Sequence, residues 1–353
     1  MRALALQQAA AGHDVRIITA TAGAGDVFAG TEVIDGISVH RVAAHIPAGL
    51  PIHPRTRREV SAVLSTDPVD VVHVHAGVIS PFAWGAIRAA RDAGLPTLVT
   101  VHCIWGPVAE RAFALSDRTL GWSAWGIQLS AVSRVAAAHI EKAAPGSSPV
   151  LVIPNGITPS DWAVEQVPRV DDAVRIASVM RIAPRKRVIP LLRMLESAQR
   201  MVGSSNRLEL TIVGDGPGRA RAEKFALRRG LVVNFAGRLD RAGIRDVFSR
   251  TDIYVQPSIK ESFGLAALEA RCAGLPLVIH ADSGTTQFVS DGVEGLVGAD
   301  DVAMAGAIAQ LAYDRSLRER IATHNRTHEP ADSWPNVLRE VIHGYEVASS
   351  ARS

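Results

Sequence analysis

The chain has 353 residues, 47% of them hydrophobic and 21% charged, and it contains 38 Lys and Arg residues against 35 Asp and Glu. This size and composition are typical of two domains with large buried cores, and a net charge of +3 is too small to require nucleic acid as a partner. Two distant cysteines, Cys103 and Cys272, lack metal-ligand spacing and argue against a disulfide framework.

The chain opens with "ALALQQAAAGHDVRIIT" (residues 3–19), which predicts a helix that stops at Gly12 and then a strand. A doubly wound domain is expected to begin instead with a strand and a glycine-rich turn, and that strand normally lies in the middle of its sheet. We therefore expect the reading frame to begin upstream of residue 1, with the first strand missing here. The alternative is an unusual strand order.

Basic residues gather in "PRTRRE" (residues 54–59). They form either a solvated face or a patch that attracts anionic lipid, and contact of Arg55, Arg57 and Arg58 with the inner face of a membrane is a hypothesis. No apolar run approaches the roughly 20 residues of a membrane span, and the first residues show no signal-peptide pattern. We therefore expect a cytoplasmic protein.

Short apolar runs alternate with helix-length segments along the chain, which predicts parallel strands covered on both faces. The first series is at 15–19, 69–76, 97–102, 127–133 and 149–154, and the second is at 174–180, 208–214, 231–237, 252–258 and 276–280. Two series predict two doubly wound α/β domains, 1–156 and 157–332, joined near "PNGITPSDW" (154–162). Residues 333–353 are expected to form a helix that packs back towards the first domain.

The stretch "ESFGLAALEA" (261–270) follows the strand at 252–258 and predicts a helix that starts near Gly264. The backbone amides of Phe263, Gly264 and Leu265 are then unpaired donors that suit a phosphate group. Glu261 precedes the helix and Glu269 lies inside it, and carboxylates of this kind accept hydrogen bonds from sugar or ribose hydroxyls. The alternative is that both glutamates are ordinary solvated side chains.

Arg181 and Lys186 directly follow the strand at 174–180, in "RIAPRKR". Ligands of open α/β sheets bind at strand ends, so these two cations are expected to balance the charge of a diphosphate; the alternative is a basic turn. The run "IVGDGPG" (212–218) is not a dinucleotide fingerprint, because Arg219 stands where the last glycine would be needed.

These motifs resemble glycosyltransferase family 4. Arg181 and Lys186, "VGDGP", "ESFGLAALEARCAGLPLV" and "DGVEGLV" occur in the family's order and spacing, and "GHDVRIIT", "DVVHVHA", "TVHCIWG" and "VIPNGI" also look like family counterparts. The resemblance implies the GT-B fold of two facing Rossmann-like domains. It also implies transfer of a hexose from a UDP- or GDP-sugar to a hydroxyl acceptor, with retention of anomeric configuration.

The resemblance also implies roles for individual residues. Glu261 matches the glutamate at the transferred sugar, Glu269 the one that binds ribose, and Arg181 with Lys186 the pair that holds the diphosphate. His102 matches a histidine near the donor sugar and acceptor, although a core histidine is the alternative. No protein nucleophile, cofactor or metal ion is implied.

The acceptor is not predicted beyond three classes, which are a glycolipid, a polysaccharide and a small molecule. The alternative is that the protein only binds sugar nucleotides or acts as a scaffold, and that it is inactive because the first strand is missing.

The sequence departs from the family pattern at several positions. Met180 and Arg187 stand where glycine is usual, and Thr286 with Gln287 replaces a common Pro-Glu pair. Ser262 also replaces a glycine, and its hydroxyl is a candidate cap for the helix that follows. These changes leave the preferred donor sugar open.

Overall fold

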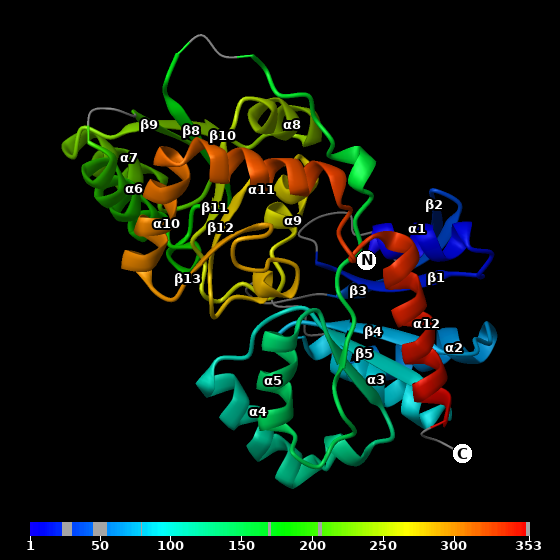
Figure 1. The fold of residues 1–353 in the computed structure, drawn as a ribbon. Helices are drawn as coiled ribbons and strands as arrows, with labels where there is room; N and C mark the ends of the chain where they lie inside the picture. Colours follow the sequence, from blue (N-terminus) through cyan, green and yellow to red (C-terminus); the bar gives the residue numbers. More distant parts are fainter. Residues whose placement is uncertain (23–29, 45–54, 79, 169–170, 204–206, 351–353) are drawn as a thin grey trace. The chain divides into compact units, whose positions relative to one another are not determined.

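The computed structural model describes residues 1–22, 30–44, 55–78, 80–168, 171–203 and 207–350. They form two compact units (Figure 1). Unit 1 comprises Met1–Gly156 together with Trp334–Ser353, and unit 2 comprises Ile157–Ser333. Both units have parallel strands with helices packed against them, so the predicted α/β class is confirmed.

The described strands of unit 1 lie in two sheets. The first has the order β1-β3-β2 and the second has the order β4-β5-β6-β7. Their bounds are β1 Arg16–Ala22, β2 Gly30–Ile34, β3 Ile37–Ala44, β4 Val72–Ala76, β5 Thr97–Val101, β6 Gln128–Ala131 and β7 Leu151–Val152. All neighbours are parallel except β2 and β3, which form a hairpin. The expectation that a further strand belongs before residue 1 stays a prediction.

The helices of unit 1 are α1 Arg2–Ala10, α2 Thr56–Thr66, α3 Pro81–Asp92, α4 Pro107–Leu120, α5 Arg134–Ala143 and α12 Trp334–Ser350. The last of these packs on the second sheet, where Val337 and Val341 form a buried cluster with Leu98 of β5. The helix at the end of the chain therefore shares the core of unit 1 (Figure 1). None of the described helices is long and apolar enough to cross a membrane.

The described strands of unit 2 lie in a parallel sheet with the order β10-β9-β8-β11-β12-β13. Its strands are β8 Val174–Val179, β9 Leu208–Val213, β10 Val232–Gly237, β11 Ile253–Gln256, β12 Leu277–His280 and β13 Gly295–Gly298. The chain runs outward from β8 to β10 and then returns to β11 on the other side of β8. The order therefore reverses between β8 and β11, and the loops after these two strands leave the same edge of the sheet.

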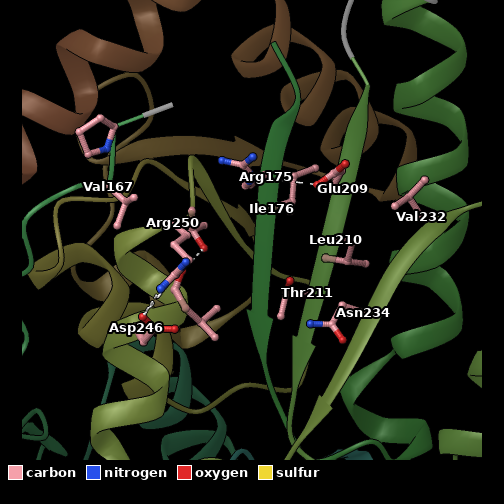
Figure 2. Close-up of a pocket in the computed structure, with 13 residues that line it drawn as sticks. Val167, Arg175, Ile176, Glu209, Leu210, Thr211, Val232, Asn234, Asp246 and Arg250 are labelled. Carbon is pink, nitrogen blue, oxygen red and sulfur yellow. Dashed lines mark hydrogen bonds and ion pairs between the residues drawn. The ribbon is translucent and has the colours of Figure 1, made fainter. Parts of the chain in front are cut away.

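The helices of unit 2 are α6 Val188–Val202, α7 Arg219–Arg228, α8 Arg241–Ser249, α9 Leu265–Cys272, α10 Asp301–Tyr313 and α11 Arg315–Thr327. An open pocket of about 770 Å³ lies beside α8, near the amino ends of β8, β9 and β10 (Figure 2). The charged side chains that line the pocket form ion pairs with one another. Arg250 lies 2.8 Å from Asp246, and Arg175 lies 3.9 Å from Glu209.

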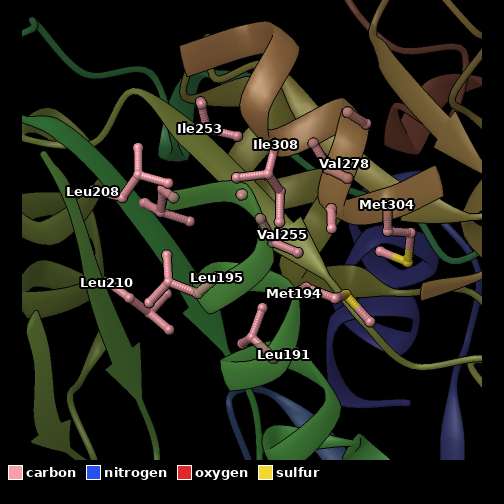
Figure 3. Close-up of a cluster of buried hydrophobic side chains, with 14 of the residues drawn as sticks. Leu191, Met194, Leu195, Leu208, Leu210, Ile253, Val255, Val278, Met304 and Ile308 are labelled. Carbon is pink, nitrogen blue, oxygen red and sulfur yellow. The ribbon is translucent and has the colours of Figure 1, made fainter. Parts of the chain in front are cut away.

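The main core of unit 2 joins α6 and α10 to the sheet (Figure 3). Leu191 and Leu195 of α6 and Ile308 of α10 are almost fully buried in it against Ile253 and Val255 of β11. The α6 helix is amphipathic, with its apolar residues at the three- and four-residue spacing that makes one continuous face. This core fixes the position of β11 and of the turn that precedes α6.

Glycines in the loop after β9 allow it to pass close to the loop after β8. A Cβ atom on Gly214 would lie 2.0 Å from the carbonyl oxygen of Met180, and one on Gly216 would lie 2.4 Å from that of Ile182. The amide of Gly218 also donates to Ile182 at 3.0 Å. The "VGDGP" motif thus packs backbone against backbone and supports the loop that carries Lys186.

Arg187 takes a left-handed conformation with φ +60° just before α6. This conformation is costly for a side chain with a Cβ and explains why glycine suits the position. Its guanidinium donates to both carboxylate oxygens of Asp301 at 2.8 Å and to the carbonyl of Pro257 at 3.1 Å. The arginine therefore joins the turn before α6 to the end of β11 and the start of α10.

We predict that Arg187→Ala lowers the free energy of unfolding by about 1–2 kcal/mol, because it removes these bonds and keeps the strained backbone. Arg187→Gly loses the same bonds but relaxes the backbone, so it should be about 1 kcal/mol more stable than the alanine variant. Urea denaturation measures both, with Arg185→Ala at the exposed neighbouring position as control. Equal midpoints for the alanine and glycine variants would contradict the strain argument.

Candidate functional site

The loops that follow β8 and β11 bring Lys186 and Glu261 together. Lys186 ends the turn Pro184–Lys186, and its Nζ lies 2.6 Å from Oε2 of Glu261. Both side chains are largely shielded from solvent, with exposed fractions of 23% and 12%. The pair stands at the carboxyl edge of the sheet where the strand order reverses, which is the expected ligand position in an open α/β sheet.

Gln256, the last residue of β11, was not predicted as a site residue. Its Nε2 donates to the same oxygen of Glu261 at 3.0 Å. Its side chain is buried, and its Oε1 accepts no hydrogen bond within the described residues. Glu261 is thus held by one charged and one neutral donor. The only signal in the sequence is a polar residue at the end of an otherwise apolar strand, in "DIYVQPS".

Arg181 is not part of this cluster. Its side chain is exposed, and within the described part of the chain it forms no ion pair and donates no hydrogen bond. Of the predicted site residues, Lys186 and Glu261 are therefore in contact. Arg181 forms no ion pair or hydrogen bond with either of them. Its predicted contact with a diphosphate stays a prediction.

The amino end of α9 carries the predicted row of amides. Gly264 is its N-cap with φ +91°, and a Cβ there would lie 2.3 Å from Cγ2 of Thr285, so only glycine fits. In the described structure the amides of Phe263, Gly264 and Leu265 donate no hydrogen bond. The helix begins at Leu265, so the N-cap position is held by Gly264 and not by Ser262, which was the candidate cap in the sequence.

Neighbouring contacts fix the approach to α9. The ring of Phe263 is buried against Phe288, with centroids 5.3 Å apart. The amide of Gly284 donates to the carbonyl of Glu261 at 2.7 Å. The turn Gly284–Gln287, which contains the unusual Thr286 and Gln287, therefore lies against the backbone of the site.

Glu269 lies on α9 and is half-buried. No described residue donates a hydrogen bond to its carboxylate. Burial raises its pKa to about 7, and the charge of Arg241 opposes part of this rise. The two predicted glutamates therefore differ, because one is ion-paired and the other is an unpaired acceptor close to its titration point at neutral pH.

His102 follows β5 in unit 1 and belongs to a group of half-buried histidines. Its Nε2 lies 2.9 Å from Nδ1 of His75, and the ring of His75 lies 4.2 Å from that of His73. Burial is the main cause that lowers the pKa of His102 to about 4 and that of His73 to about 3, and it also lowers the pKa of His75. His102 is therefore a neutral hydrogen-bonding group at pH 7.

A chain of hydrogen bonds orients His73. Gln8 donates to the hydroxyl of Tyr345 at 2.8 Å, that hydroxyl lies 3.0 Å from Nδ1 of His73, and Nε2 lies 2.7 Å from Oγ1 of Thr100. Every group is satisfied when Tyr345 donates to Nδ1 and Nε2 carries the ring proton. Because α12 supplies Tyr345, the end of the chain helps to set the histidine group.

The described residues contain no cluster of three or more His, Cys, Asp or Glu suited to a metal ion. The pocket of Figure 2 contains none of the predicted site residues and lies towards the opposite strand ends. The carboxyl edge of the sheet in unit 2 and the histidine group of unit 1 are therefore the candidate sites.

Two family models match this chain, and each covers residues that lie mostly in one of the two units. Residues 1–161 match the family described as Glycosyltransferase Family 4, and residues 162–328 match the family described as Glycosyl transferases group 1. The chain is 30% identical to the D-inositol 3-phosphate glycosyltransferase of Actinosynnema mirum over 303 residues, which cover 78% of this chain and 72% of that protein.

Two further likenesses cover most of the chain. The GDP-mannose-dependent alpha-mannosyltransferase of Mycobacterium tuberculosis is 27% identical over 97% of this chain and 90% of its own length. The crystal structure of Anabaena Alr3699/HepE in complex with UDP and glucose superposes with a TM-score of 0.68 at 17% identity, over 89% of this chain and 87% of that one. The structural likeness shows a common fold.

The raised pKa of Glu269 makes stability depend on pH. Between pH 4.5 and about 7 the folded protein keeps a proton that the unfolded chain releases, so the stability from this group is complete below pH 4.5 and is lost as pH rises through 7. We predict that Glu269→Gln is more stable than the wild type at pH 8 by about 2 kcal/mol and that the difference disappears near pH 4.5.

Urea denaturation of both proteins at several pH values tests this prediction. Glu223→Gln, on the exposed side of α7, is the matched control and should change little. A constant difference between Glu269→Gln and wild type from pH 4.5 to 8 would show that burial does not perturb the carboxylate.

Proposed function

The chain belongs to glycosyltransferase family 4, and we propose that it transfers a hexose-type sugar from a UDP- or GDP-linked donor with retention of anomeric configuration. Membership of the family, with the GT-B fold, makes it an enzyme that takes its sugar from a nucleotide sugar. The identity of the nucleotide, the retention and the acceptor are the proposed part. The acceptor is a hydroxyl group of a glycolipid, a polysaccharide or a small molecule.

The observation that carries the proposal is the meeting of Lys186 and Glu261 at the strand reversal of unit 2. A cation, a carboxylate and the unpaired amides before α9 suit the parts of a nucleotide sugar. The amides and Lys186 bind the diphosphate, and Glu261 accepts hydrogen bonds from hydroxyls of the transferred sugar. Glu269, whose carboxylate accepts no bond from a described residue, binds the ribose hydroxyls.

Bond cleavage between the sugar and the diphosphate leaves negative charge on the departing phosphate. Preorganised cations and amides at that position lower the barrier because they stabilise charge as it develops. When the donor binds, Lys186 would give up its ion pair with Glu261 and bind the diphosphate instead. Arg181, whose side chain is exposed after β8, would supply the second positive charge.

The acceptor hydroxyl would lose its proton to the departing phosphate on the same face of the sugar. This scheme needs no protein nucleophile and no metal cofactor, because two cationic side chains supply the neutralising charge. His102, neutral at pH 7, would contact the sugar or the acceptor through hydrogen bonds. Names of relatives support a hexosyl donor, since one is GDP-mannose-dependent and another glycosylates an inositol phosphate.

We predict that a UDP- or GDP-sugar raises the thermal unfolding midpoint of the full chain and is consumed when acceptors are supplied. Lys186→Ala should lower turnover by about 10²–10³-fold, because it removes a donor that stabilises the leaving group. Arg185→Ala, at an exposed position of the same turn, is the matched control and should remain active. Full activity of the Lys186 variant would refute its assigned role.

A separate prediction concerns Gln256. Gln256→Met keeps the length of the side chain but removes the donor to Glu261, so the carboxylate loses its orientation once Lys186 turns to the diphosphate. The variant should lose about 10–100-fold in kcat, the value of a hydrogen bond to a charged group, with little change in the donor KM. Steady-state kinetics separate the two constants.

Gln256→Glu is the companion variant, since it places a second carboxylate against Glu261 and should be at least as inactive. Thermal unfolding confirms that each variant is folded. A wild-type kcat in Gln256→Met, or a loss seen only in KM, would exclude a role for Gln256 in positioning Glu261.

A further inference from the structure

The α4 helix of unit 1 presents apolar side chains to solvent. None of its residues is buried, and the side chains of Val108, Leu115 and Leu120 are 82%, 63% and 51% exposed. Val108 and Leu115 are seven residues apart, so they lie on one face of the helix. Arg111 and Arg118 fall on the same face, and neither forms an ion pair within the described residues.

The acidic residues of α4 are on the opposite side. Glu110 forms a short ion pair with His139 of α5. Asp117 accepts hydrogen bonds from the amide and the hydroxyl of Ser123, both at 2.7 Å. Phe113, on the same inner side, stacks on Trp105 with ring centroids 4.0 Å apart. The solvent face, hereafter the α4 stripe (Val108, Arg111, Leu115 and Arg118), therefore combines two positive charges with apolar groups and has no acid.

Other basic helices in the described structure lack this combination. In α2, Arg57 is bonded to Asp92, and no large apolar side chain is exposed beside the arginines. In α7, Leu227 is 83% exposed among basic residues, but it is a single apolar group and Glu223 lies on the same surface. Charge alone is thus present at 55–58, where the sequence suggested lipid contact, whereas α4 offers charge and apolar area together.

The positive charge of the α4 stripe favours a partner with negative charge. Apolar groups between guanidiniums along one side of a helix suit the interface of a bilayer, where the apolar groups enter the boundary of the acyl chains and the guanidiniums bind lipid phosphates. A second copy of the chain would oppose arginine to arginine on this face. Anionic lipid supplies both the negative charge and the apolar layer.

We propose that the α4 stripe docks the protein on an anionic membrane surface. The helix lies parallel to the bilayer, with Val108 and Leu115 inserted and Arg111 and Arg118 against lipid phosphates. Helix α4 is joined to His102 by the four residues 103–106, so docking places the histidine group of unit 1 close to the lipid surface. The inference concerns binding and holds whichever donor the enzyme uses.

Co-sedimentation of the full chain with vesicles tests the proposal. Vesicles of phosphatidylcholine with phosphatidylglycerol should retain the wild type, and those of phosphatidylcholine alone should not. Arg111→Gln with Arg118→Gln should weaken binding about 25-fold, or about fivefold for each charge. Val108→Gln with Leu115→Gln should weaken it about tenfold or more.

The matched control is Arg221→Gln with Arg228→Gln, which removes two charges from exposed positions on α7 and should bind like the wild type. Unchanged thermal unfolding shows that each variant is folded. If the wild type does not bind the anionic vesicles, the proposal is wrong, and an acidic protein surface becomes the alternative partner of the α4 stripe. An equal loss in the control, or no loss in either α4 variant, overturns it as well.

Discussion

The ion pair between Lys186 and Glu261 joins two segments that are 75 residues apart in sequence. It exists because β8 and β11 are neighbours at the reversal of the strand order, which directs both following loops to one edge of the sheet. Three supports keep the lysine there. The glycines after β9 pack under the loop, Arg187 bonds to the end of β11, and the same guanidinium binds the start of α10. The cation is thus in place before a ligand arrives.

The two glutamates of the site have different electrostatic environments, and this difference suits different parts of a nucleotide sugar. Glu261 is paired with a cation that a diphosphate would attract, so ligand binding changes its surroundings. Glu269 has no bonded cation, and its raised pKa reflects loss of water. A half-buried acceptor without a partner gains from a hydroxyl pair, which is what a ribose offers. The histidine group of unit 1 is neutral at pH 7, so it offers hydrogen-bonding groups without charge.

The sequence predicted those features of the fold that depend on residues close together in the chain. The apolar runs predicted most parallel strands, and the α9 glycine with its unpaired amides followed from the start of a helix. It missed the hairpin of β2 and β3, although Asp35-Gly36 is a turn signal: both residues have positive φ there. Ser262 was a candidate cap for α9, but Gly264 holds the N-cap position, and a Cβ atom there would lie 2.3 Å from Cγ2 of Thr285.

Contacts between distant segments could not be predicted in the same way. The bond from Gln256 to Glu261 depends on how a loop folds back over the end of its strand, and the bonds of Arg187 depend on the placement of α10. The substitution of glycine by Arg187 is a clear case, since the sequence shows only the unfavourable residue and the structure shows the bonds that offset it.

A crystal structure of the full chain tests the role of Lys186 most directly, if the crystals contain the nucleoside diphosphate of whichever donor raises the thermal unfolding midpoint. We expect a diphosphate at the amino end of α9, with Nζ of Lys186 within hydrogen-bonding distance of a phosphate oxygen and Glu261 still bonded to Gln256. A diphosphate bound elsewhere, with Lys186 still paired to Glu261, would contradict this role of Lys186.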